Sequence, residues 1–287
     1  MKRTDGTAYY LFSLLCFFVA RLLIKVIPQM PSFEIVFIRS LVSLSLSYSV
    51  IHRQKLSILG TNWKDLLFRG IFGSLGMLTF FYSLQHLPLG TATALTNLSP
   101  IFTIFFAGFF LGEKTKKREW ILFFIAFLGV MLLKGVDGKI SLFDFLVGLS
   151  SAIFSGAAYN FIRKIKDKEN PHVIVFSLSF VSIPLFIPFV IATWKTPTLL
   201  EIVIMLLVGV VTQLAQVNMT KAHQTSKTAS SIMHYAYLDV VLSVIVGYLL
   251  FHEPCTWLSM IGIGIIISSV YLIRQSQKRT ALVVAPT

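Results

Sequence analysis

Apolar runs of about twenty residues recur along almost the whole chain, and no other feature of the sequence constrains its fold as strongly. A helix of about twenty apolar residues can cross the roughly 30 Å hydrocarbon core of a bilayer. Only 13% of the 287 residues are charged, whereas about a quarter are charged in an ordinary soluble domain. The sequence therefore predicts an all-α integral membrane protein. Ten transmembrane helices are expected, at residues 8–27, 33–51, 66–87, 91–111, 119–134, 142–162, 172–193, 199–220, 228–251 and 256–274.

Lysine and arginine are distributed unevenly between the two sets of loops that ten spans create. The N-terminus, the even-numbered loops and the C-terminus, counted with Arg69 and Arg274 near the adjoining span ends, carry 19 of the 25 basic residues. The odd-numbered loops, counted with the adjoining span ends, carry only Lys25, Lys134, Lys139 and Lys195. Basic loops stay on the cytoplasmic side, so both termini are predicted to be cytoplasmic in a bacterial inner membrane. The basic loops that give the net charge of +13 are therefore expected to orient the protein in the membrane and to face anionic lipid headgroups. No nucleic-acid partner is expected.

The spans divide into two sets of five, and their sequences indicate a repeat. Residues 97–113 align with residues 237–253, and thirteen residues separate Pro100 from Glu113 just as they separate Val240 from Glu253. An odd number of spans in each unit makes the second copy cross the membrane in the opposite sense. The predicted units are a first five-helix repeat at 7–135, a second at 142–275 and a cytoplasmic tail at 276–287.

Several motifs of the first half resemble the EamA-type units of the drug/metabolite transporter superfamily. They are Phe80-Phe81-Tyr82-Ser83-Leu84, Leu87-Pro88-Leu89-Gly90-Thr91-Ala92, Leu98-Ser99-Pro100 and Leu111-Gly112-Glu113. Residues 37–41, with Arg39 at their centre, are similar to the arginine-bearing second helix of that family. The second half departs from the pattern, because Asp239-Val240 stands where the family more often has Glu-Pro.

The resemblance covers residues 7–275 and implies a carrier with two inverted five-helix repeats around a central cavity. Such carriers work by alternating access, without a cofactor. Members move amino acids, nucleotide-linked sugars, S-adenosylmethionine, purines, organic anions or drugs, so the resemblance leaves the solute open. A monomer or a homodimer is expected.

Two arginines lie within the predicted spans at similar depth. Arg21 is six residues before the outer end of its span and Arg39 is six residues after the outer start of the next, which places both about 9 Å deep. A charge inside a membrane costs at least about 2.5–3.5 kcal/mol. Together the two guanidinium groups are a predicted site for an anionic or carboxylate-bearing solute. The alternative is structural: Arg39 pairs with a carboxylate or helix-end carbonyls, and Arg21 extends to the outer interface.

Asp239 lies at the centre of the span at 228–251, five residues after His234. A carboxyl group surrounded by apolar groups takes up a proton more readily than in water, which predicts a proton-coupling role for Asp239 and His234. The alternative is that Asp239 is a fixed counter-ion for Arg21 or Arg39 and that His234 is a core histidine.

Neutral polar side chains within the spans supply the remaining candidates. Some of them must hydrogen-bond between helices, because an unsatisfied amide in hydrocarbon is costly. The others are predicted to face a solute cavity. The substrate-binding candidates, besides the two arginines, are Tyr82, Asn97, Tyr159, Gln213 and Tyr237.

The sequence contains no HExxH, no GxSxG, no paired aspartates and no glycine-rich phosphate loop. Cys16 and Cys255 have no metal-ligand spacing, so neither a metal site nor a cofactor is expected. The sequence therefore predicts a secondary-active transporter of a small organic metabolite, which is amino-acid-like, nucleoside-like such as S-adenosylmethionine, or an organic anion. Proton coupling and solute exchange are both open. The alternatives are an intramembrane enzyme and a channel.

Overall fold

The computed structural model describes residues 6–111, 117–134, 140–165, 167–225, 236–253 and 256–284, and within these ranges it is all-helical with no strand. The helices are α1 (Thr7–Val26), α2 (Ser32–Arg53), α3 (Trp63–His86), α4 (Leu89–Thr96), α5 (Ser99–Leu111), α6 (Lys117–Lys134), α7 (Leu142–Ile165), α8 (Pro171–Thr193), α9 (Leu199–Thr225), α10 (Ala236–Phe251) and α11 (Trp257–Val284).

The described residues contain seven helical segments that are long and apolar enough to cross a membrane. They are α1, α2, α3, α7 and α8 in full, Leu89–Gly108 across α4 and α5, and Leu199–Ala222 of α9. Asp239–Phe251 and Trp257–Ser269 are shorter apolar helices. The prediction of an all-α, multi-pass membrane protein is confirmed, and the total of ten spans stays a prediction.

The span predicted at 91–111 is interrupted, and α4 and α5 replace one helix. Pro100 is the cause, because it has no N–H to donate and its ring collides with the carbonyl of the preceding turn. Asn97 ends α4 and its side-chain Nδ2 donates to the Thr93 carbonyl at 2.9 Å. Proline has a different effect in α8, which continues through Pro184 and Pro188.

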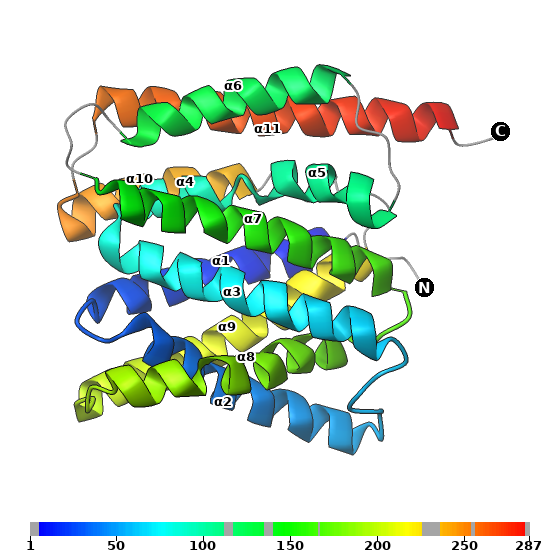
Figure 1. Cartoon of the computed structure of the whole chain (residues 1–287), viewed down its shortest axis with the longest axis vertical. Helices are drawn as coiled ribbons and strands as arrows, with labels where there is room; N and C mark the ends of the chain where they lie inside the picture. The colour runs from blue at the N-terminus through cyan, green and yellow to red at the C-terminus, as the bar shows by residue number, and fades with distance from the viewer. Residues whose placement is uncertain are drawn as a thin grey trace.

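Helices of the first half pack mainly against helices of the second half. The pairs are α1 with α9, α2 with α8, α3 with α7, α4 with α10, and α6 with α11. In Figure 1, α6 and α11 lie side by side at one end of the long axis, and α2 and α8 lie at the other end. The start of α1 and the end of α11 lie toward the same side of the molecule (Figure 1).

Glu169, between α7 and α8, connects two loops at one end of the bundle. Its Oε1 accepts hydrogen bonds from the Thr61 N–H at 2.6 Å, the Thr61 hydroxyl at 2.6 Å and the Asn62 N–H at 2.9 Å. Gly60 has a φ of 60°, and a Cβ there would lie 2.6 Å from Glu169 Oε2. Glycine is therefore required at this turn both for its backbone conformation and for the approach of the carboxylate.

Burial acts to raise the pKa of Glu169, but the hydrogen bonds from Thr61 and Asn62 outweigh it and hold the pKa below its usual value. A carboxyl group with a depressed folded-state pKa stabilises the protein above its unfolded pKa of about 4.3 and loses that contribution as the pH falls through the folded value. We expect Glu169→Gln to lower the free energy of unfolding by about 1 kcal/mol at pH 7. The difference in Tm between wild type and variant should disappear as the pH falls below about 4. An equal difference at every pH would show that the charge has no role.

Candidate functional site

A cavity of about 170 Å³ lies between the two halves of the chain. Its walls come from α1, α2, α3, α4 and α5 of the first half and from α7, α8, α9 and α10 of the second. Aromatic and thioether side chains form much of the wall, as is usual for a site that holds an organic molecule. They include Phe17, Met77, Phe80, Phe81 and Met219.

The cavity is offset toward one end of the bundle. Its residues on α7 begin at Ser155 and those on α9 begin at Thr212, so they lie in the second half of each helix. The end of α9 packs against the start of α1, where Tyr10 and Ala222 form a small buried cluster. The cavity therefore extends from the middle of the bundle toward the side on which α1 begins.

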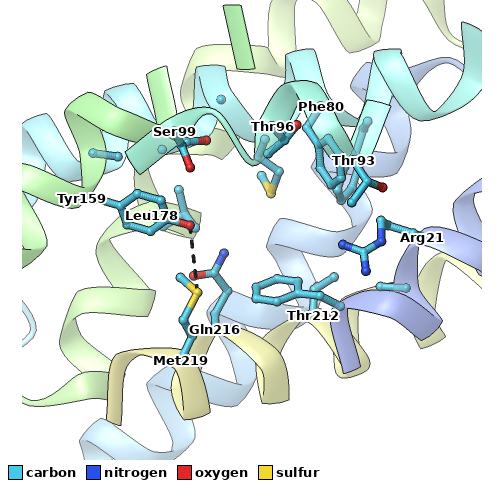
Figure 2. A pocket seen from close by; sticks show the side chains of 18 of the residues that line it. Arg21, Phe80, Thr93, Thr96, Ser99, Tyr159, Leu178, Thr212, Gln216 and Met219 are labelled. Carbon is cyan, nitrogen blue, oxygen red and sulfur yellow. Dashed lines mark hydrogen bonds between the residues drawn. The ribbon is translucent and has the colours of Figure 1, made fainter. Parts of the chain in front are cut away.

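Arg21 and Asp239 form a buried ion pair at the cavity wall. The Arg21 guanidinium donates to Asp239 Oδ1 and thereby connects α1 to α10. Figure 2 shows the Arg21 guanidinium directed into the space between α9 and the α4–α5 segment. This ion pair is the one expected if Asp239 is a fixed counter-ion for Arg21. Arg21 is buried and does not extend to the outer interface, as the structural alternative had proposed.

Arg39 is fully buried, with 0% of its surface exposed, and it lines the same cavity. Its Nε donates to Thr212 Oγ1 at 2.9 Å. Its Nη1 and Nη2 have no hydrogen-bond partner within the described residues. The carboxylate or helix-end carbonyls expected under the structural alternative are therefore not found at the terminal nitrogens.

Arg69 is a third cavity arginine that the sequence pattern did not single out. The charge count grouped it with the loop between the second and third spans, although it falls near the start of the predicted span 66–87. In the structure α3 begins at Trp63 and carries Arg69 in its second turn, 3% exposed. Its Nη2 contacts Gln216 Oε1 at 3.5 Å and its Nε has no partner within the described part of the chain. One signal was present: Gly73 follows Arg69 by one helical turn, and its missing side chain leaves room on that face for the guanidinium.

Two of the predicted neutral residues line the cavity. Asn97 lies at the break between α4 and α5. Tyr159 of α7 places its hydroxyl 4.0 Å from Met219 Sδ. Figure 2 shows Tyr159 and Arg21 at opposite ends of the cavity.

Tyr82 and Gln213 do not line this cavity. The Tyr82 hydroxyl donates to Asp144 Oδ1 at 2.8 Å near the other end of α3. Gln213 accepts from the Ser43 hydroxyl and donates to Ser47 Oγ at 2.7 Å, which joins α9 to α2. The reason is helical geometry, because consecutive residues point about 100° apart. Thr212 therefore faces the cavity, and Gln213 faces α2.

The remaining candidates lie partly or wholly outside the described residues. Tyr237 belongs to α10, but its side chain is outside the described set, and His234 lies outside the described residues altogether. Glu113 and Cys255 do too, whereas Cys16 is a buried free thiol. Among the described residues no group of three or more His, Cys, Asp or Glu side chains could hold a metal ion.

Known proteins match the chain over nearly its full length. The EamA-like transporter family model matches residues 6–134 and 142–275. The chain is 30% identical over 251 residues to the pseudopaline exporter CntI of Pseudomonas aeruginosa, covering 87% of this chain and 88% of the relative. It is 27% identical over 252 residues to an S-adenosylmethionine uptake transporter of Rickettsia bellii, covering 88% and 86%.

A solved crystal structure shares the fold, with a TM-score of 0.67 and 16% sequence identity over 96% of this chain and 98% of the other. This match shows that the two proteins share the same fold. The chain therefore belongs to the EamA-like transporter family, whose members are membrane transporters and not enzymes.

Proposed function

We propose that this chain is a secondary-active carrier that moves a small organic solute by alternating access through the cavity between its two halves. The observation that carries the proposal is a cavity between nine of the described helices, with a largely apolar wall into which three arginines and one aspartate are set. Polar groups inside a membrane protein are costly and occur where a solute or ion passes. The relatives include a named exporter and a named uptake transporter, and the direction of transport is left to experiment.

The pattern of helix contacts supports two inverted five-span repeats. Exchanging the halves turns α1 into α7, α2 into α8, α3 into α9, the α4–α5 segment into α10, and α6 into α11. Under this exchange the α2–α8, α4–α10 and α6–α11 contacts are unchanged, and the α1–α9 contact becomes the α3–α7 contact. Contacts that survive the exchange are those expected of carriers in which one repeat rocks against the other.

A polar closure at the end of the bundle away from the cavity supports alternating access. Lys25 Nζ lies 2.7 Å from Glu253 Oε1 and donates to the Leu87 carbonyl at 2.6 Å. Glu253 Oε2 in turn accepts from the Leu89 N–H at 2.6 Å. These contacts join α1, the α3–α4 connection and the end of α10. In the proposed cycle they hold one face closed while the cavity is accessible from the other.

The proposed topology has ten spans, with both termini in the cytoplasm of a bacterial inner membrane. The start of α1 and the end of α11 on one side of the molecule (Figure 1) accord with an even number of crossings. The cavity then extends toward the cytoplasmic side and the Lys25–Glu253 closure lies at the outer face.

Counterflow in proteoliposomes tests the carrier proposal. Vesicles containing the purified protein are loaded with unlabelled S-adenosylmethionine, succinate or benzoate and diluted into the same labelled solute. We expect saturable uptake of at least one solute that is accelerated by the internal unlabelled pool, because a carrier exchanges faster than it returns empty. Protein-free vesicles are the control. Uptake that neither saturates nor responds to the internal pool would indicate a channel and contradict the proposal.

A further inference from the structure

The charged groups that line the cavity do not balance. Arg21, Arg39 and Arg69 are all buried, and Asp239 is the one acidic residue among the described lining residues. Asp239 is already bound to Arg21. Two buried guanidinium groups therefore have no negative partner in the described part of the protein, and an unpaired buried charge is strongly unfavourable.

The unpaired hydrogen-bond donors belong to the same two arginines. Within the described residues nothing binds Nη1 and Nη2 of Arg39, and these atoms form the edge of the guanidinium that binds both oxygens of a carboxylate. Thr212 binds Arg39 through Nε and so orients the group while leaving that edge open. Arg69 leaves Nε free and has only a long 3.5 Å contact to Gln216. Both guanidinium groups line the same cavity.

Gly73 determines where the Arg69 guanidinium lies. A Cβ at Gly73 would lie 1.8 Å from Arg69 Nη1, so the guanidinium occupies the space that any larger residue would fill. Gly73 and Arg69 both line the cavity. The helix thus carries a notch, one turn after the arginine, that keeps the positive charge at the cavity wall.

We propose that the cavity binds a small organic solute through a carboxylate held between Arg39 and Arg69, with its carbon skeleton against the aromatic wall. The bound carboxylate supplies the negative charge and the hydrogen-bond acceptors that both arginines lack. The proposal deepens the proposed carrier function and rests on it for the statement that the bound anion is transported.

Thermal shift of the purified protein with two acids and their neutral amides tests the binding site. Succinate and benzoate are expected to raise Tm with concentration by mass action, whereas succinamide and benzamide, which match them in shape, are not. Inorganic phosphate is the third probe. Equal shifts with acid and amide, no shift with either acid, or a shift with phosphate as large as with succinate would each overturn the assignment.

Variants assign the effect to the two arginines. Arg39→Gln and Arg69→Gln are each expected to raise the Kd of the acids about tenfold to a hundredfold. The Arg39→Gln protein without ligand should keep its Tm, because the lost Thr212 contact is offset by removal of an uncompensated buried charge. A large fall in Tm with an unchanged Kd in the remaining folded protein would assign Arg39 to the structure alone and overturn the proposal.

Gly73→Ala tests the site without removing a charge. The added methyl group must displace the Arg69 guanidinium, so the Kd of the acids is expected to rise severalfold. Gly264→Ala in α11 is the matched control, because a Cβ there has no atom within 4 Å. Equal acid affinity in the two variants would overturn the role of Arg69.

The binding site and the carrier function can fail separately. Acid binding without counterflow would support the anion site and refute the carrier. Counterflow of S-adenosylmethionine without acid binding would support the carrier and refute the anion site.

Discussion

Asp239→Asn is expected to lower the free energy of unfolding by about 3–5 kcal/mol, the largest stability effect of any substitution considered for this chain. The pair with Arg21 is buried, with 6% of Asp239 exposed, and Arg21 Nε already has no partner within the described residues. Removing the carboxylate charge leaves the three buried cavity arginines without a counter-charge among the lining residues that the structure describes. The measurement is unfolding of the purified protein in mixed micelles by titration with sodium dodecyl sulfate.

The control is a double substitution. Arg21→Met with Asp239→Leu removes both charges, and replacement of a whole buried ion pair by apolar residues of similar size is often neutral. We therefore expect the double variant to be closer in stability to the wild type than Asp239→Asn is. If the double variant is the less stable of the two, the ion pair is not the reason for the effect.

Asp239→Asn also tests proton coupling, the second role predicted for this residue. In vesicles with an imposed pH gradient, a carrier that moves a proton on Asp239 should lose its gradient-driven accumulation while counterflow of the same solute continues. Unchanged accumulation in the folded variant would leave Asp239 as a fixed counter-ion for Arg21.

Gly156→Val is expected to destabilise the protein by about 3 kcal/mol, because the interface between α7 and α5 has no room for a side chain. A Cβ at Gly156 would lie 2.6 Å from Phe102 Cβ and 2.9 Å from both the Phe102 carbonyl carbon and the Thr103 nitrogen. Two of these are backbone atoms, so a rotamer change cannot relieve the clash. Asn160 fixes the same contact by donating to the Thr103 carbonyl at 2.9 Å. Tm in detergent measures the effect.

Gly264→Val provides the comparison, since it makes the same chemical change where a Cβ meets no atom within 4 Å. Glycine and valine differ little in helix preference compared with the expected clash, so this variant should unfold near the wild-type temperature. A Gly156→Val protein as stable as Gly264→Val would mean that α5 and α7 can separate without cost, contrary to the packing described.

The sequence was most informative where a local property decides the structure. Apolar length determines membrane insertion. The missing N–H of proline weakens a helix, but it does not distinguish Pro100, where the predicted span 91–111 is interrupted, from Pro184 and Pro188, through which α8 continues. Apolar length also predicted the ends of the first two helices. Spans were expected at 8–27 and 33–51, and α1 and α2 are Thr7–Val26 and Ser32–Arg53. Asn97 and Tyr159 were selected because an amide or a phenol within hydrocarbon requires a partner, and both line the cavity, but the same criterion selected Tyr82 and Gln213, which do not.

The directions in which polar side chains point were decided by the tertiary structure. Thr212 and Gln213 are adjacent in sequence and both are polar, yet one binds Arg39 in the cavity and the other joins two helices. Arg69 lies near the start of the predicted span 66–87 and was counted with the orienting loop charges, because its sequence position does not show that its side chain turns into the cavity.

The sequence alone therefore determined that this chain is a helical membrane protein with Arg21, Arg39 and Asp239 deep within its spans. Only the tertiary structure decided how those charges combine. It joins Arg21 to Asp239 across 218 positions of the chain, and it places Arg39 and Arg69 at one cavity without an acidic partner among the described residues. The physical reason is that helix composition fixes which residues enter the membrane, whereas the pairing of their charges depends on how the helices of the two halves pack.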